Sequence, residues 1–412
     1  SRVGFENTHG YEGREVNLPR IVLLTTSYPT HPNDWSGVFI AKLAEALGKK
    51  GYRILVICPA VPKGHGRYPV NGIDTVRFGY FFPRSLERLT GGEGGIPENL
   101  STSVLARIQL MPMMGRFFHE VLRETRSSDV VYANWLGAAL VGASVCSLRK
   151  APLVVSLRGD DGYLARDKPL WRILTKWVIR KSAFLAPVSK QLLQIVLDLG
   201  AAQSKCSLPR FGVDTDLFYP ASKHNLSEEM VCVVFVGSLV QKKGVQDLLT
   251  ALSAPELNKV QLTVVGDGLY SGRLKSLCHE LALDERTRWR GVVSPREVAS
   301  ILRESDILCL PSYTEGSPNV IKEAMASGLP VVATRVGGIP DLVSTEQTGL
   351  LYEPGDVEGL KKCLVSLVQN HEMRRRFGDE ARRIITEGAL SWDTTAEDFN
   401  VIFRKCVSEK PT

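Results

Sequence analysis

The sequence lacks a run of apolar residues long enough to cross a membrane. A transmembrane helix needs roughly 20 mostly apolar residues in succession, and no stretch of the 412 residues approaches that length. The first residues also lack the basic segment followed by an apolar segment that marks a secretory signal. We therefore expect a cytoplasmic protein that is not integral to a membrane.

Closely spaced cysteine pairs are absent as well. The eight cysteines are scattered along the chain without a CxxC pair, so the usual signature of a structural zinc site is missing. Most of them stand in apolar surroundings typical of strands and helices. We expect buried thiols in a reducing compartment and no zinc site.

The charge that is present is unevenly distributed. Residues 20–210 contain 26 Lys or Arg against 13 Asp or Glu, whereas residues 211–412 contain 23 against 28. This surplus indicates an anionic partner for the first half, either a membrane surface or a phosphorylated acceptor. A basic face that only keeps the protein in solution is the alternative, and we do not expect a nucleic acid partner.

Strand-like and helix-like segments alternate along the chain and restart after a polar, turn-rich passage. This order predicts parallel sheets with crossover helices, so the fold class is α/β with two tandem doubly wound, Rossmann-like domains facing a cleft. Short strands are expected at 183–188 and 205–209. The expected organisation is a flexible tail at 1–17, a first domain at 18–212, a linker at 213–229, a second domain at 230–390, and a last helix at 391–412 that packs back on the first domain.

The most informative stretch is Leu310 to Ala333. An apolar strand is followed by Glu315 and Gly316, and Ser317 and Pro318 have the residue types of a helix N-cap and a first helical residue. The free amides and positive dipole end of such a helix bind phosphate well. Glu323 lies inside the same predicted helix.

This stretch resembles the E-x7-E signature of retaining glycosyltransferase family 4, which has the GT-B fold. The likeness covers about residues 20 to 385. It implies a nucleotide-sugar donor, most often a UDP-sugar, in the second domain and a glycan or lipid-linked acceptor in the first. It further implies retention of the anomeric configuration and no metal or other cofactor.

Further matches to the family follow in its order along the chain. Lys243 matches one of two cations that hold the diphosphate, while Ser238 stands where the family usually has Arg. Gly266 lies in a glycine-rich turn that lines the nucleotide site in the family. The same turn imitates a dinucleotide fingerprint, but no acidic residue follows at the required distance.

In the first domain, Gly37 resembles the glycine of a loop that approaches the transferred sugar. Arg158 stands where many members have His, and Asp160 follows two residues later. From the resemblance we expect three catalytic residues, Arg158, Asp160 and Glu315. The expected donor-binding residues are Gly37, Ser238, Lys243, Gly266, Gly316, Ser317, Asn319, Val320 and Glu323.

The resemblance thus predicts a glycosyltransferase, and we expect a role in cell-envelope or exopolysaccharide synthesis. A GT-B-type sugar-nucleotide epimerase is the alternative, followed by a dinucleotide-dependent oxidoreductase. Residues 101–126 combine apolar positions with four arginines. They predict either an amphipathic element on an anionic membrane, which would make the protein peripheral, or a helix packed on the core.

Overall fold

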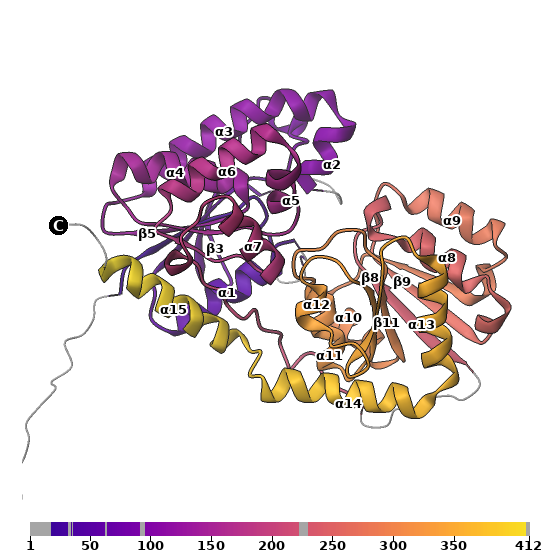
Figure 1. Ribbon diagram of the computed structural model, residues 1–412. Coiled ribbons are helices and arrows are strands. Elements are labelled where there is room, and N and C mark those ends of the chain that lie inside the picture. Colours follow the sequence, from indigo (N-terminus) through magenta and orange to yellow (C-terminus); the bar gives the residue numbers. More distant parts are fainter. Residues whose placement is uncertain are drawn as a thin grey trace, which may run out of the picture.

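The computed structural model describes residues 18–31, 34, 36–61, 64–90, 95–221 and 230–408, except for the side chains of Pro97 and Asp160. The expected tail at 1–17 and residues 222–229 of the expected linker lie outside the described residues. Two α/β domains stand side by side, the first at the upper left and the second at the lower right of Figure 1. The predicted α/β architecture with two parallel-sheet domains is confirmed.

The first domain is built on a sheet of seven strands in the order β3-β4-β2-β1-β5-β6-β7. All neighbouring strands are parallel except the β3–β4 pair at one edge. The central strands are apolar and fully buried, because helices cover both faces of a parallel sheet. The strands are β1 (Ile21–Leu24), β2 (Ile54–Pro59), β3 (Gly66–Val70), β4 (Ile73–Phe78), β5 (Val130–Asn134), β6 (Leu153–Ser156) and β7 (Phe184–Leu185).

Seven α-helices accompany this sheet in the described part of the chain. The residues of α3, α4 and α6 share one buried cluster with Val22 and Leu24, while those of α1 and α7 share another with Ile21 and Leu23. The two clusters are the two faces of the sheet, since successive side chains of β1 point to opposite sides. The helices are α1 (Val38–Lys49), α2 (Gly95–Thr102), α3 (Val104–Glu124), α4 (Leu136–Arg149), α5 (Asp160–Asp167), α6 (Pro169–Lys181) and α7 (Lys190–Asp198).

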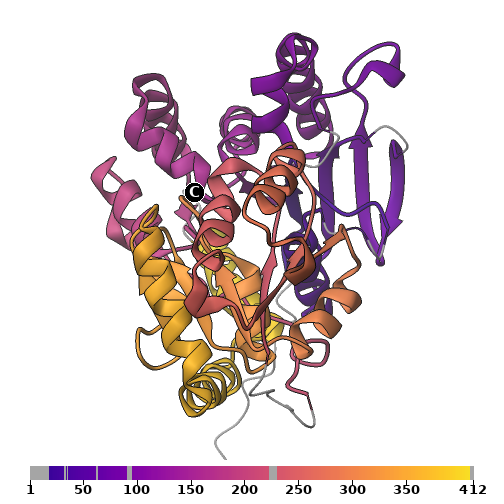
Figure 2. The same ribbon diagram turned by 90° about the vertical axis from the view of Figure 1, so that its right-hand side faces the viewer.

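The second domain contains six parallel strands in the order β10-β9-β8-β11-β12-β13. Figure 2 shows this domain in front of the first after a quarter turn. Its strands are β8 (Val231–Val236), β9 (Val260–Val265), β10 (Thr287–Gly291), β11 (Ile307–Leu310), β12 (Val331–Thr334) and β13 (Gly349–Tyr352). Its helices are α8 (Val245–Leu252), α9 (Ser271–Glu280), α10 (Pro295–Arg303), α11 (Asn319–Ala326), α12 (Ile339–Leu342), α13 (Val357–Gln369) and α14 (His371–Glu387).

Serine side chains fix the beginnings of several helices. The side chain of Ser103 accepts a hydrogen bond from the amide of α3, that of Ser189 from α7, and that of Ser294 from α10. At α10 the cap is reciprocal, because Glu297 also bonds back to the backbone of Ser294. Each cap satisfies a helix-end amide that would otherwise have no partner within the helix.

The last helix, α15 (Trp392–Ser408), returns to the first domain after α14 has packed on the second (Figure 1). Phe399 and Phe403 are fully buried there, with ring centroids 5.0 and 5.9 Å from that of Tyr132 on β5. The apolar face of α15 therefore completes the cluster beneath α1. The chain crosses between the domains twice, once near 211 and once near 390.

The sequence prediction differs from the structure at several elements. The strand expected at 205–209 is wrong, because Cys206 forms only an isolated bridge with Leu185. No expectation was made for the β3–β4 hairpin, for α5 and α6, or for β13. The edge strand β3 is largely exposed and contains Pro69, so it lacks the apolar run that marks the central strands.

Replacing Phe399 by Ala should destabilise the first domain, although the residue lies near the end of the chain. Loss of a fully buried aromatic side chain costs about 3–5 kcal/mol. Urea unfolding followed by tryptophan fluorescence should show a lower midpoint for Phe399→Ala. Val401→Ala on the exposed side of the same helix is the control, and an equal effect of both changes would contradict the packing described.

Candidate active site

The acidic residue Glu315 lies in the loop that follows β11. Its side-chain oxygen Oε1 accepts a hydrogen bond from Ser312 Oγ at 2.7 Å and forms an ion pair with Lys243 Nζ at 2.6 Å. Only 9% of Glu315 is exposed, so the pair is shielded from most of the solvent. The structure thus brings together two residues that the sequence places 72 positions apart.

Two glycines let the neighbouring loops approach this ion pair. Gly244 follows Lys243 with a φ of +71°, and a Cβ there would lie 1.9 Å from the carbonyl oxygen of Pro311. Gly266 after β9 has a φ of +125°, and a Cβ there would lie 1.9 Å from the carbonyl oxygen of Gly237. Close backbone contact therefore requires glycine at both positions. Ser238, which follows Gly237, is partly exposed at the same edge of the sheet.

The helix after this loop begins one residue later than the sequence predicted. Pro318 has an extended ψ of 119° and is the residue before α11, so Asn319 is the first helical residue. The prediction that Ser317 caps the helix is wrong, because no side chain caps α11. The first amides of the helix, from Asn319 and Val320 onward, have no partner inside the helix and remain available to an acceptor.

The Glu315 loop is pressed against the first domain. A Cβ on Gly316 would lie 2.8 Å from the amide nitrogen of Gly159, and Tyr163 Oη donates to the carbonyl oxygen of Glu315 at 2.9 Å. Nearby, Asp341 Oδ2 accepts from the amide of Lys190 at 2.8 Å. The loop with Glu315 and Gly316 is therefore part of the domain interface.

Gly37 has a structural reason to be glycine. It precedes α1 with a φ of +70°, and a Cβ there would lie 2.4 Å from the carbonyl oxygen of Ser27. This loop conformation accounts for the glycine without a ligand. The sugar contact that the sequence suggested for Gly37 stays a prediction.

The side chain of Arg158 lies in an aromatic enclosure. Its Cζ atom is 4.4 Å from the ring centroid of Phe39 and 4.7 Å from that of Phe211, and its Nε donates to Asn134 Oδ1 at 2.8 Å. Burial lowers the pKa of this guanidinium. Arg158 Nη2 and Asn134 Nδ2 are buried with no hydrogen-bond partner among the described residues. These contacts pack Arg158 between two aromatic rings, and its catalytic role stays a prediction. So does that of Asp160, whose side chain lies outside the described part.

Two neighbouring ionisable residues on α11 are perturbed by burial. Lys322 is 1% exposed and donates to the carbonyl oxygen of Phe211 at 3.1 Å. Burial lowers the pKa of Lys322 to about 7, against the effect of Glu323. Burial also raises the pKa of Glu323 to about 7, against the effect of Lys322. Both residues therefore titrate near neutral pH.

Sequence reasoning overlooked two residues that join the domains here. Lys322 is the single basic residue of the stretch from Leu310 to Ala333, and this is the signal that could have identified it. Tyr163 lies in α5, for which the sequence gave no expectation. Its contact with Glu315 depends on tertiary structure alone.

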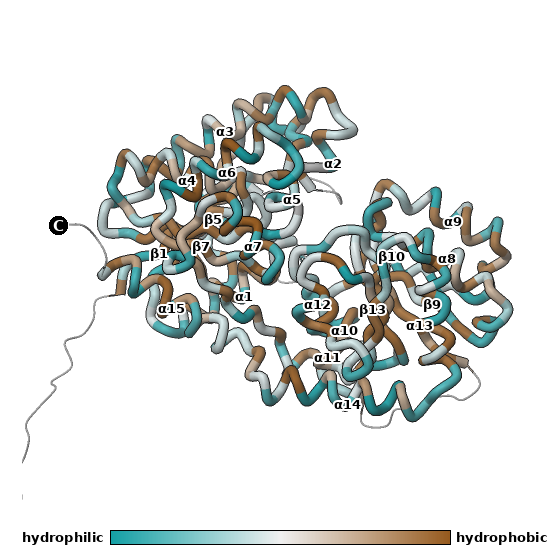
Figure 3. The backbone as a smooth tube through the Cα atoms, in the orientation of Figure 1, coloured by the Kyte–Doolittle hydropathy of each residue, from teal (hydrophilic) through white to brown (hydrophobic). Residues whose placement is uncertain are grey.

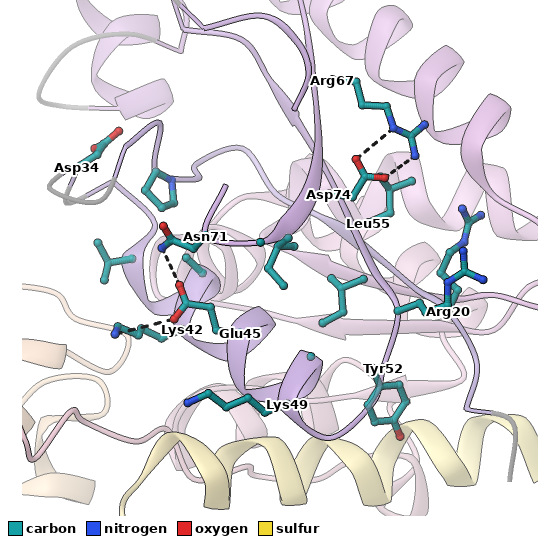
Figure 4. A pocket seen from close by; sticks show the side chains of 18 of the residues that line it. Arg20, Asp34, Lys42, Glu45, Lys49, Tyr52, Leu55, Arg67, Asn71 and Asp74 are labelled. Atoms are coloured by element: carbon teal, nitrogen blue, oxygen red, sulfur yellow. Dashed lines mark hydrogen bonds and ion pairs between the residues drawn. The ribbon is translucent and has the colours of Figure 1, made fainter. Parts of the chain in front are cut away.

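A cavity of about 860 Å³ lies beside α1 in the first domain (Figure 4). Its polar side chains pair with one another: Asn71 Nδ2 donates to Glu45 at 2.7 Å, and Arg67 Nε donates to Asp74 at 3.1 Å. Asp34, three residues before Gly37, also lines it. The cavity therefore offers a polar lining close to the Gly37 loop, apart from Glu315 and Lys243.

Comparison with known families and proteins assigns both halves of the chain. The model of "Glycosyl transferases group 1" matches residues 221–384, and that of "Glycosyl transferase 4-like domain" matches residues 36–210. An MMP alpha-(1->4)-mannosyltransferase of Mycolicibacterium hassiacum is 27% identical, covering 94% of this chain and 98% of the relative. These matches favour neither the epimerase nor the oxidoreductase alternative.

Solved structures share the fold at low sequence identity. Sucrose-phosphate synthase from Thermosynechococcus elongatus aligns with a TM-score of 0.79 at 19% identity, over 95% of this chain and 99% of that one. Anabaena Alr3699/HepE, solved in complex with UDP and glucose, aligns with a TM-score of 0.72 at 19% identity, over 94% and 99%. The GT-B fold predicted from the motifs is confirmed.

Substituting Lys for Arg158 separates a packing role from a sugar-contacting one. The lysine retains the charge but cannot stack on the aromatic rings or donate to Asn134 in the same way. The free energy of unfolding should therefore fall by about 1–3 kcal/mol. Urea unfolding is the measurement, with the exposed Arg180→Lys as control. Unchanged stability together with a large loss of turnover would show that the guanidinium acts on the substrate instead.

Proposed function

Because this chain belongs to the family 4 glycosyltransferases with the GT-B fold, we propose that it transfers a sugar from a nucleotide-sugar donor to a glycan or lipid-linked acceptor. A UDP-sugar is the favoured donor, and the anomeric configuration is retained. The observation that carries the proposal is the Lys243–Glu315 ion pair beside the uncapped start of α11. Cell-envelope or exopolysaccharide synthesis suits the basic first domain.

The start of α11 and Lys243 would hold the diphosphate of the donor. Free amides at Asn319 and Val320 donate to phosphate oxygens, and the helix dipole favours the negative charge. Gly316 and Ser317 precede these amides and carry no bulky side chain that would block access. Charge that develops on the leaving diphosphate is thereby stabilised by preorganised groups, so the proposal includes no metal ion.

The Lys243–Glu315 ion pair would rearrange when the donor binds. A diphosphate next to Lys243 Nζ competes with Glu315 for the ammonium group. The carboxylate of Glu315 is then available to accept hydrogen bonds from the hydroxyls of the donor sugar, close to the reacting carbon. Glu323, one to two turns further along α11, would accept from the ribose hydroxyls, and the turns at Ser238 and Gly266 would flank the nucleotide.

The first domain would bind the acceptor. The interface places its Gly159 against Gly316, so an acceptor held by this domain would lie near the donor sugar. The polar cavity beside α1 suits the hydroxyl groups of a glycan. Support for UDP comes from HepE, whose structure contains UDP and glucose and which shares the fold over 94% of this chain.

Thermal-shift measurements with UDP-, GDP-, ADP- and TDP-sugars test the donor proposal. A ligand at about 100 times its Kd stabilises the folded state by about 2.7 kcal/mol, so one donor class should raise the Tm by several degrees. Glu323→Ala and Lys243→Ala should lose this shift, whereas the exposed Glu285→Ala keeps it. EDTA should leave it unchanged. If wild type responds to none of the four classes, the proposal is wrong.

The raised pKa of Glu323 predicts a pH-dependent affinity for the donor. With a pKa of about 7, the fraction of Glu323 present as carboxylate rises about tenfold between pH 6 and pH 8. Since the carboxylate accepts from ribose hydroxyls, the donor KM should fall by about that factor as the pH rises. Steady-state kinetics should show no such trend in Glu323→Gln.

Lys322 titrates in the same range and needs its own control. Lys322→Met removes its charge while keeping a long apolar stem at the buried position. The KM trend should persist in this variant and vanish only in Glu323→Gln. A trend that persists in Glu323→Gln would contradict the role given to Glu323.

A further inference from the structure

Helix α6 is basic on its outside and contains no acidic residue. Residues 168–181 include five Lys or Arg and no Asp or Glu. The buried side of the helix is already satisfied, since Thr175, Val178 and Ile179 pack into the domain. Leu170 and Ile173 are nevertheless 63% exposed, on the side away from the core. Their exposure is not explained by packing within the domain.

Helix α3 exposes a second set of apolar side chains. Val104 is 69%, Ile108 58% and Met111 75% exposed, all in the first half of the helix. The 79–90 loop, which follows β4, adds Phe82, which is 89% exposed. Gln109 on α3 holds this loop, because its Nε2 donates to the carbonyl oxygen of Leu86 at 2.6 Å.

The topology places these two sets at the same end of the domain. Helices α3, α4 and α6 cover one face of the sheet, with α4 packed against both of the others (Figure 1). The C-terminal ends of α3 and α6 lead into β5 and β7, which run parallel to β1. Both helices therefore begin at the carboxyl edge of the sheet, the edge where Gly159 meets Gly316.

Basic side chains surround the exposed apolar ones. Figure 3 shows hydrophilic positions interspersed with hydrophobic ones along α3 and α6. Two of the acidic residues nearby are turned inward or paired: Glu87 is 2% exposed and accepts from the backbone at 80 and 81, and Glu120 is paired with Arg116 and Arg123. Glu98 on α2 is partly exposed. The exposed basic residues of the 79–90 loop, α3 and α6, together with Lys168 just before α6, are Arg84, Arg88, Arg107, Arg116, Arg123, Lys168, Arg172, Lys176, Arg180 and Lys181.

We propose that the apolar and basic residues of the 79–90 loop, α3 and α6 form a docking face for an anionic lipid bilayer. Apolar side chains on a helix flanked by Lys and Arg insert into the boundary between headgroups and acyl chains, and the cations bind acidic headgroups. Trp171 and Trp177 on α6 are partly exposed, as is typical of residues at such a boundary. Charge complementarity selects this partner over an uncharged surface.

Docking on this face would orient the interface of the two domains toward the membrane. The edge that carries the face is the edge beside the Glu315 loop, so a lipid-linked acceptor would reach the site without leaving the bilayer. This inference rests on the proposed function and adds that the acceptor comes from the membrane. Within the described residues, no helix is both long and apolar enough to span a membrane.

Co-sedimentation of the full chain with lipid vesicles tests the inference. At low ionic strength, wild type should bind vesicles of phosphatidylcholine that contain phosphatidylglycerol. It should bind much more weakly to vesicles of phosphatidylcholine alone, or to either kind at high salt. Two double variants should bind about tenfold or more weakly. They are Leu170→Ser with Ile173→Ser, and Arg172→Glu with Lys176→Glu.

Matched substitutions on the second domain serve as controls. Leu269→Ser removes an apolar side chain that is 66% exposed, and Arg290→Glu with Arg296→Glu reverses two exposed charges. Both should bind vesicles as wild type does. Wild type that stays in the supernatant, or face variants that bind as wild type, would overturn the inference.

Two further measurements separate the possible failures. The nucleotide-induced thermal shift should persist in every docking-face variant, because the altered residues lie apart from Lys243 and Glu315. Loss of vesicle binding in a variant that keeps the nucleotide-induced thermal shift therefore concerns docking alone. A thermal shift that is absent in wild type contradicts the proposed function. Light scattering that shows a dimer abolished by Leu170→Ser with Ile173→Ser, without vesicle binding, would assign the face to a second copy and overturn the inference.

Discussion

Phe211 holds the two domains at a fixed point where the chain crosses between them. Its ring stacks on the guanidinium of Arg158 in the first domain, and its carbonyl oxygen accepts from Lys322 in the second at 3.1 Å. Beside it, a side chain at Gly212 would lie 2.2 Å from the backbone of Ser391 at the other crossing. Burying two cations is costly, and the hydrogen bonds and aromatic faces of this arrangement offset that cost. The position of the Glu315 loop relative to the first domain depends on it.

Most of the fold could be predicted because the central strands are short apolar runs with turn residues between them. Parallel strands buried on both faces have this appearance in any sequence. Two of the elements without an expectation have a different signal: β3 is an exposed edge strand, and α6 is apolar on more than one side. Because α6 was not predicted, the exposure of Leu170 and Ile173 could not be predicted either. The outward face of a helix can be identified only after the helix itself has been placed.

The candidate site could be located from sequence, but its contacts could not be derived. The motif around Glu315 predicted a loop and a helix with free amides, and both are present. Sequence could not pair Lys243 with Glu315, because loop packing at Gly244 and Pro311 decides that distance. Nor could it place Arg158, since its neighbours Phe39 and Phe211 come from segments on either side of it in the chain.

The return of α15 to the first domain has a consequence for synthesis. Domains of a growing chain usually fold in the order in which they leave the ribosome. Here Phe399 and Phe403, which complete the layer beneath α1, follow the whole second domain along the chain. The first domain therefore keeps an uncovered apolar surface until the second domain and α15 have been synthesised. Apolar surface that stays exposed during this interval would make the nascent chain prone to aggregation.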